Sequence, residues 1–259
     1  MIKICISGAL GRMGKNIIDV VKEDPEVEIK GLLEKKGTFQ KGDKINGIEI
    51  TDDVEKATEL CDCFIDFTNP EATVEHLKKI KIPAVVGTTG FDADEINEIK
   101  KISKKIPVVL SPNMSRGVNL LFSIVRKVCE KLYDYDIEIV EAHHNKKKDA
   151  PSGTAKKIAD IINDIRHLKK TYGREGFTGE RKKDELGIHA IRAGEIVGEH
   201  EVIFAGKGEI FKISHTALSR KCFAEGAVFA AKWVCGKKPA LYSMGDVLAS
   251  EIENFRWIR

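Results

Sequence analysis

Residues that could carry out acid–base chemistry gather in one short segment, EAHHNKKKDAPSGT, which runs from Glu141 to Thr154. Its two histidines, His143 and His144, can exchange protons near neutral pH, and the lysines at 146–148 add positive charge. Residues 151–154 (PSGT) indicate a helix start, where unpaired backbone N–H groups and the helix dipole attract anions. The segment therefore predicts a pocket for a small anionic molecule that needs a proton, which is typical of an enzyme.

Each part of this segment also has an ordinary explanation. A run of three lysines is usually a solvated surface, a histidine pair after a strand usually packs or forms hydrogen bonds, and a PSGT turn usually caps a helix. The functional interpretation depends on their combination within fourteen residues, with no apolar residue between His143 and Asp149.

The composition excludes several classes of protein. With 259 residues, 42% of them hydrophobic and 32% charged, the chain is long enough for one large or two modest globular domains. Its 43 Lys and Arg against 40 Asp and Glu give a net charge of +3, which is too balanced for bulk binding to nucleic acid or a membrane surface.

The cysteines and the remaining histidines do not form a metal-binding pattern. The six cysteines have neither paired nor metal-ligand spacing, and His189, His200 and His215 fall in separate strand-like segments without a C-x-x-C motif. We therefore expect no metal. Without a signal peptide or an apolar run near 18 residues, we expect a soluble cytoplasmic protein with reduced thiols.

The first residues have the order strand, glycine-rich turn, helix. Met1 to Ser7 alternates apolar and polar residues, GALGRMG follows at 8–14, and a helical pattern then continues to Pro25. This order is what a dinucleotide phosphate site requires, because glycines let backbone N–H groups approach a pyrophosphate. The spacing G-x-x-G-x-x-G is weak evidence by itself, and its context strengthens it.

An acidic residue ends the second predicted strand. Val27 to Leu33 leads to Glu34, which is placed to hold the ribose hydroxyls of an adenosine. Lys35 and Lys36 follow, and their charges would attract the 2′-phosphate that Glu34 repels. The site could therefore accept NADH, NADPH or both, while the competing interpretation is a loop with unrelated charges.

Strands and helices continue to alternate through the first half. Strands are predicted at 61–67, 84–86 and 107–110, with helices at about 70–80, where Thr68 or Asn69 is the cap, and at 92–104. This pattern predicts an α/β fold with a Rossmann-like, doubly wound parallel sheet, in which ligands bind beyond the carboxyl ends of the strands. The loops at 8–14, 34, 67–68, 87–90 and 111–114 should converge there.

The second half predicts an α+β domain with a mostly antiparallel or mixed open sheet. A helix at about 118–132 precedes strands at 137–142, 187–193, 195–205 and 210–217, with a helix at 154–166 and a long loop at 171–186. Hairpin turns are expected at Ala193-Gly194 and at 206–208. We expect a dinucleotide-binding domain at 1–114, a substrate-binding and oligomerisation domain at 115–223, and a return of 224–259 to the first domain. The default place for chemistry is a cleft between them.

Seven motifs together resemble one enzyme family in order and over nearly the whole chain. They are GALGRMG, Leu33-Glu34-Lys35, VVGTTGF (85–91), SPNMSRGVN (111–119), EAHHNKKKDAPSGT, YGREGFTGER (172–181) and IRAGEIVGEHEVIFAG (191–206). The chain resembles dihydrodipicolinate reductase, also called 4-hydroxy-tetrahydrodipicolinate reductase, of lysine and diaminopimelate biosynthesis. The His-His-Lys segment is highly specific, and the glycine turn is not.

The resemblance implies a role for each matching residue. His143 would be the general acid, Lys147 a second catalytic proton donor, and His144, Gly153 and Thr154 substrate contacts. The implied nicotinamide contacts are Gly8, Ala9, Leu10, Gly11, Arg12, Met13, Glu34, Lys35, Gly87, Thr88, Thr89, Ser111, Pro112, Asn113 and Met114. The resemblance also implies a small dicarboxylate substrate and a homotetramer that associates through the sheet domain.

This sequence differs from the family pattern in small ways, and two alternatives stay open. Lys35 stands where some members have arginine, so charge toward a 2′-phosphate remains but a bidentate grip is lost. The alternatives are a related NAD(P)-dependent dehydrogenase of another amino or keto acid, and a non-enzymatic nucleotide-binding regulator. A nucleic-acid binder would need aromatic stacking positions, and none lies within 141–154.

Overall fold

The computed structural model of the protein describes residues 1–252, with only the backbone described for residues 250–252. The chain forms two compact units. Of the described residues, unit 1 contains 1–116 and 220–252, and unit 2 contains Gly117–Ser219. Of the predicted return over 224–259, the part after Ile252 lies outside the described residues.

Unit 1 is built on an eight-stranded sheet with the order β13-β7-β6-β5-β1-β2-β4-β3. All neighbouring strands are parallel except β3 and β4. The strands are β1 (Ile2–Ser7), β2 (Val27–Leu33), β3 (Lys44–Ile45), β4 (Ile48–Thr51), β5 (Cys63–Asp66), β6 (Ala84–Val86), β7 (Val108–Leu110) and β13 (Leu241–Tyr242). The chain leaves β1 for β2 on one side and later places β5 on the other, so the direction of winding changes at β1.

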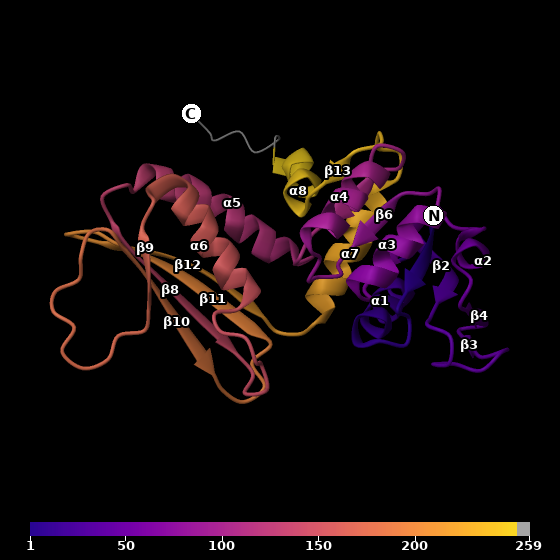
Figure 1. The fold of residues 1–259 in the computed structure, drawn as a ribbon, viewed down its shortest axis with the longest axis horizontal. Coiled ribbons are helices and arrows are strands. Elements are labelled where there is room, and N and C mark those ends of the chain that lie inside the picture. The colour runs from indigo at the N-terminus through magenta and orange to yellow at the C-terminus, as the bar shows by residue number, and fades with distance from the viewer. Residues whose placement is uncertain (253–259) are drawn as a thin grey trace. The chain divides into compact units, whose positions relative to one another are not determined.

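Helices cover both faces of this sheet (Figure 1). They are α1 (Arg12–Lys22), α2 (Val54–Thr58), α3 (Pro70–Lys79), α4 (Ala93–Ile102), α7 (Lys221–Val234) and α8 (Met244–Ile252). One apolar cluster joins α1, α7 and α8 to the strands, and another joins α2, α3 and α4 to them. Because β5 and β6 are buried along their whole length, the predicted doubly wound α/β fold is confirmed.

The helix starts of unit 1 follow local capping chemistry. Of the two predicted caps before α3, Asn69 takes the role: its side chain accepts a hydrogen bond from the Ala72 N–H, and Pro70 occupies the first turn. Before α4, Asp92 and Glu95 form a reciprocal capping box.

Unit 2 contains a five-stranded mixed sheet with the order β12-β11-β8-β10-β9. Strands β8, β10 and β9 run parallel, and β11 is antiparallel to both β8 and β12. The strands are β8 (Asp136–His143), β9 (Lys169–Tyr172), β10 (Glu185–Arg192), β11 (Gly198–Ala205) and β12 (Ile210–Ala217), and the helices are α5 (Arg116–Lys131) and α6 (Gly153–Arg166). The predicted mixed sheet is confirmed.

One predicted connection in unit 2 is wrong. Ala193-Gly194 is not a hairpin turn, because β8 lies between β10 and β11 and β10 pairs with β8 in parallel. The long loop expected at 171–186 is present at 173–184, and its predicted end residues belong to β9 and β10. The hairpin at 206–208 is confirmed by the antiparallel pair β11 and β12 and by a bond from the Gly206 N–H to the Glu209 carbonyl.

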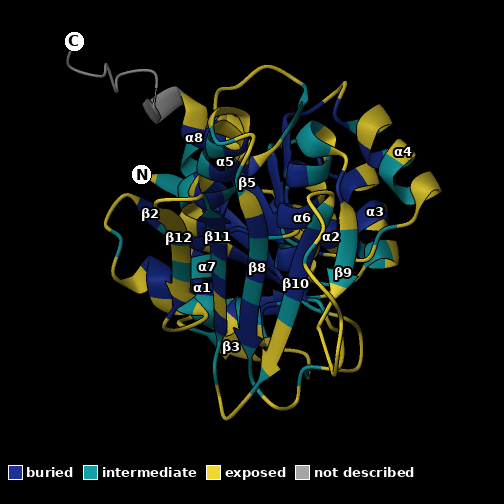
Figure 2. Ribbon diagram, turned by 90° about the vertical axis from the view of Figure 1, so that its left-hand side faces the viewer, coloured by how far each residue is buried: buried dark blue, intermediate teal, exposed yellow. Residues whose placement is uncertain are grey.

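Helices cover one face of the unit 2 sheet. Helices α5 and α6 pack on one face through an apolar cluster that includes Val125, Ile137, Ile158, Val202 and Phe204. Along β8, Ile137, Ile139 and Glu141 are buried and alternate with half-buried Glu138 and Val140. Figure 2 shows the same mixture of buried and less buried residues along β8, β10 and β11. Exposed Ile191 and Ile210 lie in β10 and β12.

Gly226 lets helix α7 approach the loop after β7. A Cβ at this position would lie 1.8 Å from the Met114 carbonyl oxygen. Alanine has a helix propensity about 1 kcal/mol more favourable than glycine. Overpacking of this kind typically costs about 1–3 kcal/mol, so the close contact should make the substitution destabilising.

We therefore expect Gly226→Ala to lower the free energy of unfolding by about 1–3 kcal/mol, measured by urea denaturation. Gly208→Ala is the control, because a Cβ there meets no atom within 4 Å. Equal stability of the two variants would contradict the close packing of α7.

Candidate active site

The glycine turn of unit 1 is shaped by close backbone contacts. Gly8 has a φ of +77°, and a Cβ on it would lie 2.9 Å from the Phe67 carbonyl oxygen. A Cβ on Gly14 would lie 2.2 Å from the Gly8 carbonyl oxygen, so helix α1 starts directly against the end of β1. These contacts require glycine and bring the N-terminus of α1, with Gly11 as its cap, beside the turn.

A groove of about 790 Å³ lies at the carboxyl ends of β1, β2 and β5, where the direction of winding changes. Such a position is where open α/β sheets bind dinucleotides. Five predicted cofactor contacts line it, namely Gly8, Leu10, Gly11, Glu34 and Lys35, together with Lys36, Thr38, Thr68 and His76, among others. The residues present therefore fit a nicotinamide dinucleotide.

Glu34 connects the end of β2 to the glycine turn. Its Oε1 accepts a hydrogen bond of 2.6 Å from the Leu10 N–H, and its Oε2 accepts bonds from the Lys35 N–H and the Thr38 hydroxyl. Lys35 and Lys36 line the same groove. The carboxylate and the two cations thus lie together, as the sequence predicted from their adjacency.

The other predicted cofactor residues are not among the lining residues of this groove. Ala9 and Met114 are buried in the apolar cluster beneath α1 and α7, and Met13 packs against it. Ser111 donates its hydroxyl to the Asn113 carbonyl, which fixes the turn after β7. The remaining predicted residues, Arg12, Gly87, Thr88, Thr89, Pro112 and Asn113, belong to α1 or to the loops after β6 and β7.

Asp66, which no sequence pattern singled out, organises the loops after β5 and β6. This fully buried carboxylate accepts hydrogen bonds from the hydroxyls of Thr68, Thr73 and Thr88 and a 3.0 Å contact from His76 Nδ1. Burial would raise the pKa of Asp66, but its bonds to His76 and the threonines outweigh this, so the pKa is lowered. Thr88 therefore supports the loop with its side chain.

In unit 2, His143 lies at the end of β8 and contacts the buried carboxylate of Glu141. His143 Nδ1 is 2.5 Å from Glu141 Oε2. Two further groups satisfy the carboxylate: Arg192 at the end of β10 makes bonds of 2.8 and 3.0 Å to the two oxygens, and the Ser152 N–H donates to Oε1 at 3.0 Å. Burial would raise the pKa of Glu141, but Arg192 and His143 outweigh it and hold the pKa below its usual range.

His143 faces opposing influences. Burial lowers its pKa, Glu141 raises it, and the positive charges of Lys147 and Arg192 lower it, with a net lowering. The neutral imidazole is therefore favoured near neutral pH. Its neighbour His200 lies edge-on at 5.2 Å between ring centroids, and burial lowers the pKa of His200 to about 4.

The start of α6 lies beside this group. Ser152 is the N-cap, because its hydroxyl accepts from the Ala155 N–H, and it shares a 3.1 Å hydrogen bond with His200 Nε2. Gly153 and Thr154, the predicted anion contacts, are the first two residues of the helix. The positive end of α6 is thereby fixed next to the Glu141 carboxylate that holds His143.

Only one of the three lysines packs down onto the site. The side chain of Lys147 is 22% exposed, and its Nζ is 2.8 Å from Asp149 Oδ1, whereas Lys146 and Lys148 are exposed. The buried Nδ1 of His144 has no hydrogen-bond partner within the described residues. Sequence reasoning singled out the histidines and Lys147 but missed Arg192 and His200, which reach the site only through strand pairing.

Comparisons with known proteins agree with this architecture. The chain matches the family description "Dihydrodipicolinate reductase, N-terminus" over residues 2–114 and "Dihydrodipicolinate reductase, C-terminus" over residues 117–248. The 4-hydroxy-tetrahydrodipicolinate reductase of Geotalea daltonii is 44% identical over 264 residues, which cover 96% of this chain and 99% of that one. The corresponding protein of Caldanaerobacter subterraneus subsp. tengcongensis is 46% identical over 253 residues, covering 96% and 98%.

Two solved structures are similar to this chain, one in sequence and fold and one in fold alone. The dipicolinate-bound dihydrodipicolinate reductase from Paenisporosarcina sp. TG-14 superposes with a TM-score of 0.79 at 26% identity and covers 94% of this chain and 97% of that one. A diaminopimelate dehydrogenase of C. glutamicum, at 12% identity and a TM-score of 0.58, shares the fold alone.

The doubly wound fold and the groove at the ends of its strands fit a dinucleotide-binding protein, and the curated relatives make it a nicotinamide-dependent oxidoreductase. The chain belongs to the dihydrodipicolinate reductase family, so the predicted resemblance is confirmed.

Among the side chains described, those of residues 1–249, no group of three or more His, Cys, Asp or Glu is placed to hold a metal ion. No helix in the same range is long and apolar enough to cross a membrane.

Proposed function

We propose that this protein reduces 4-hydroxy-tetrahydrodipicolinate, by way of dihydrodipicolinate, to tetrahydrodipicolinate in diaminopimelate and lysine biosynthesis, using NADH, NADPH or both. Family membership supports this reaction. The observation that carries it is the grouping of a histidine held by a buried carboxylate, a packed-down lysine and a helix start at one end of the unit 2 sheet.

When bound, the nicotinamide supplies the hydride. The glycine turn at residues 8–13, Glu34 and Lys35 would hold the dinucleotide, with the Gly87–Thr89 and Ser111–Met114 loops as further predicted contacts. The groove at the carboxyl ends of β1, β2 and β5 supports the first of these assignments.

Lys147, His144 and the start of α6 would bind the substrate carboxylates. The relative from Paenisporosarcina sp. TG-14 is described as dipicolinate-bound, and dipicolinate is a planar dicarboxylate. A lysine and the positive end of a helix suit such an anion, because both favour negative charge. The N–H groups at Gly153 and Thr154 would receive one carboxylate.

His143 would deliver the proton. Hydride addition at one end of the conjugated system moves an electron pair toward the ring nitrogen, and a proton must arrive at the neighbouring carbon. Burial lowers the pKa of the imidazole without substrate, and the negative charge of a bound dicarboxylate would raise that pKa and favour a proton on Nε2. Substrate binding would thus favour the charged form of the donor.

The reaction is tested by a coupled assay in which aspartate semialdehyde, pyruvate and the preceding synthase generate the substrate. Oxidation of NADH and NADPH is followed separately. Oxidation that requires both the synthase and this protein is expected. No oxidation with either cofactor, by protein shown to bind one, would overturn the proposed substrate.

Loss of the general acid should lower turnover without loss of cofactor. We expect His143→Ala to lower kcat by about 10²–10⁴, the usual contribution of a positioned acid, while the Kd for NADH stays within about twofold of wild type. His167→Asn is the control, because His167 has a φ of +52° at the end of α6, a conformation that asparagine tolerates. An unchanged kcat in His143→Ala would contradict the assignment.

Removal of Lys147 should affect the substrate side alone. Lys147→Ala is expected to lower kcat and to raise the KM for the dicarboxylate, since the side chain would compensate the negative charge of the substrate. Lys146→Ala, which removes an exposed neighbouring lysine, should leave both constants near wild type. A defect confined to cofactor binding would refute the role of Lys147.

The Glu34–Lys35 pair should set the preference between cofactors. We expect Glu34→Gln to raise the NADPH to NADH ratio of kcat/KM on the order of tenfold, because one negative charge near the 2′-phosphate is removed. Lys35→Ala should lower the same ratio, and Lys30→Ala, which lies on β2 away from this groove, is the control. Ratios that do not change in either variant would exclude this pair.

We further propose a cytoplasmic homotetramer that associates through the face of the unit 2 sheet opposite α5 and α6. Exposed Ile191 and Ile210 on the strands of this sheet support an apolar contact. Light scattering of the purified protein measures the mass, and a monomer at micromolar concentration would contradict the assembly.

A further inference from the structure

The ionised Glu141 carboxylate determines which nitrogen of His143 carries a proton. A carboxylate only accepts hydrogen bonds, so the 2.5 Å contact to His143 requires an N–H at Nδ1. In the neutral imidazole Nε2 is then the free, basic nitrogen. A Cβ on Gly198 would lie 3.1 Å from Nε2, so the glycine at the start of β11 leaves that side of the ring uncrowded.

Arg192 holds the carboxylate from a second strand and ties the lysine loop to it. Besides its two bonds to Glu141, Arg192 Nη2 donates to the Asp149 carbonyl at 2.7 Å. The side chain of Asp149 contacts Lys147. The pair Glu141–Arg192 therefore contacts His143, the Lys147 loop and, through the Ser152 N–H, the start of α6.

The two members of this pair act on His143 with opposite sign. The charged and titratable groups facing His143 are Glu141 on β8, Arg192 on β10, His200 on β11 and Lys147 in the following loop. Burial has the largest effect and lowers the pKa of His143. Glu141 raises this pKa, and Arg192 and Lys147 lower it further. His200 is neutral near pH 7 because its pKa is about 4.

We propose that Glu141 and Arg192 are a positioning pair for the proton transfer: Glu141 fixes His143 with Nε2 toward the substrate, and Arg192 balances the charge of Glu141. This inference rests on the proposed reductase function. Neither residue contacts the reacting atoms, so their effect passes through His143.

The test is the pH dependence of kcat/KM for the dicarboxylate in wild type, Glu141→Gln and Arg192→Met. Kcat/KM should fall as pH rises through the pKa of the donor in the free enzyme. In Glu141→Gln this descending limb should move to lower pH, and kcat/KM on the limb should drop on the order of tenfold. In Arg192→Met the limb should move to higher pH. The KM for the cofactor should not change in either variant.

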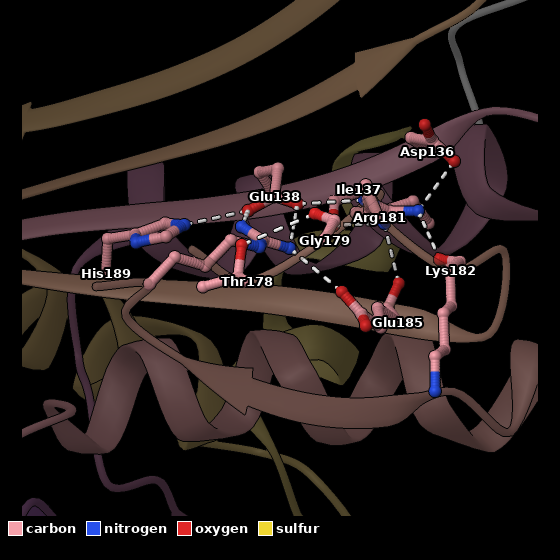
Figure 3. A network of polar contacts seen from close by, with 10 residues as sticks. Asp136, Ile137, Glu138, Thr178, Gly179, Arg181, Lys182, Glu185 and His189 are labelled. Atoms are coloured by element: carbon pink, nitrogen blue, oxygen red, sulfur yellow. Dashed lines mark hydrogen bonds and ion pairs between the residues drawn. The ribbon is translucent and has the colours of Figure 1, made fainter. Parts of the chain in front are cut away.

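Glu138→Gln is a matched control on the same strand. Glu138 accepts bonds from Arg174, Arg181 and His189, and these partners hold its pKa at about 2. Figure 3 shows His189 and Arg181 directed at this carboxylate. Because side chains alternate along a strand, Glu138 lies on the opposite face from Glu141. Its replacement should lower thermal stability and leave the descending limb in place.

If kcat falls in Glu141→Gln and Arg192→Met but the descending limb stays at the same pH, the two residues have a purely structural role. That result would overturn the proposal. If Glu141→Gln does not fold, Arg192→Met alone tests the proposal. A descending limb that moves to higher pH in this variant supports the pair, and a limb that does not move overturns it. If the wild type itself is inactive, the proposed function fails. The NMR titration of His143 then still ranks the three proteins, with Glu141→Gln lowest and Arg192→Met highest, and any other order overturns the pair.

Discussion

A carboxylate buried without solvent must be matched by donors, and in unit 2 this requirement falls on Glu141. Leaving such a charge unpaired costs several kcal/mol, and the structure brings it two N–H groups of Arg192, one of His143 and the Ser152 backbone N–H. These donors come from two strands and from the start of α6. The same carboxylate that must be satisfied for folding therefore assembles the groups that could hold and protonate an anion.

The order of strands in unit 2 meets this requirement. Parallel pairing of β10 with β8 places Arg192 opposite His143, and antiparallel pairing of β11 with β8 places His200 opposite Glu141. If β10 and β11 had formed a hairpin, β8 would not lie between them. Glu141 would then have only one of these two strands beside it. The buried carboxylate of Asp66 in unit 1 is satisfied by other donors. Three hydroxyls and His76 take the place that Arg192 has beside Glu141.

Local chemistry in the sequence was enough to predict much of the fold. The glycine turn, the cap at Thr68 or Asn69 and the alternation of strands and helices predict the doubly wound sheet, because each depends on residues near in the chain. The short elements β3, β4, α2 and β13 escaped prediction, since two to five residues carry too little periodicity. Strand β9 was missed because KKTY on a sheet edge has no apolar alternation.

The site was predicted only where its residues are contiguous. His143, Lys147 and the α6 start lie within twelve residues, whereas Arg192 and His200 join them by strand pairing over about fifty residues, which periodicity does not reveal. Asp66 stood at the end of a predicted strand without any sign that it would be buried among three threonines. Polar residues on buried strands were the signal that could have identified both networks.

We expect Glu141 to hold His143 as a neutral Nδ1–H imidazole that gains a proton when a dicarboxylate binds. ¹⁵N NMR of the histidine side chains measures this directly, with the His143 signals assigned by their loss in His143→Ala. At neutral pH we expect a protonated Nδ1 and an unprotonated Nε2 in the free protein, and protonation of both nitrogens on addition of pyridine-2,6-dicarboxylate. A proton on Nε2 alone, or an imidazolium already present in the free protein, would contradict it.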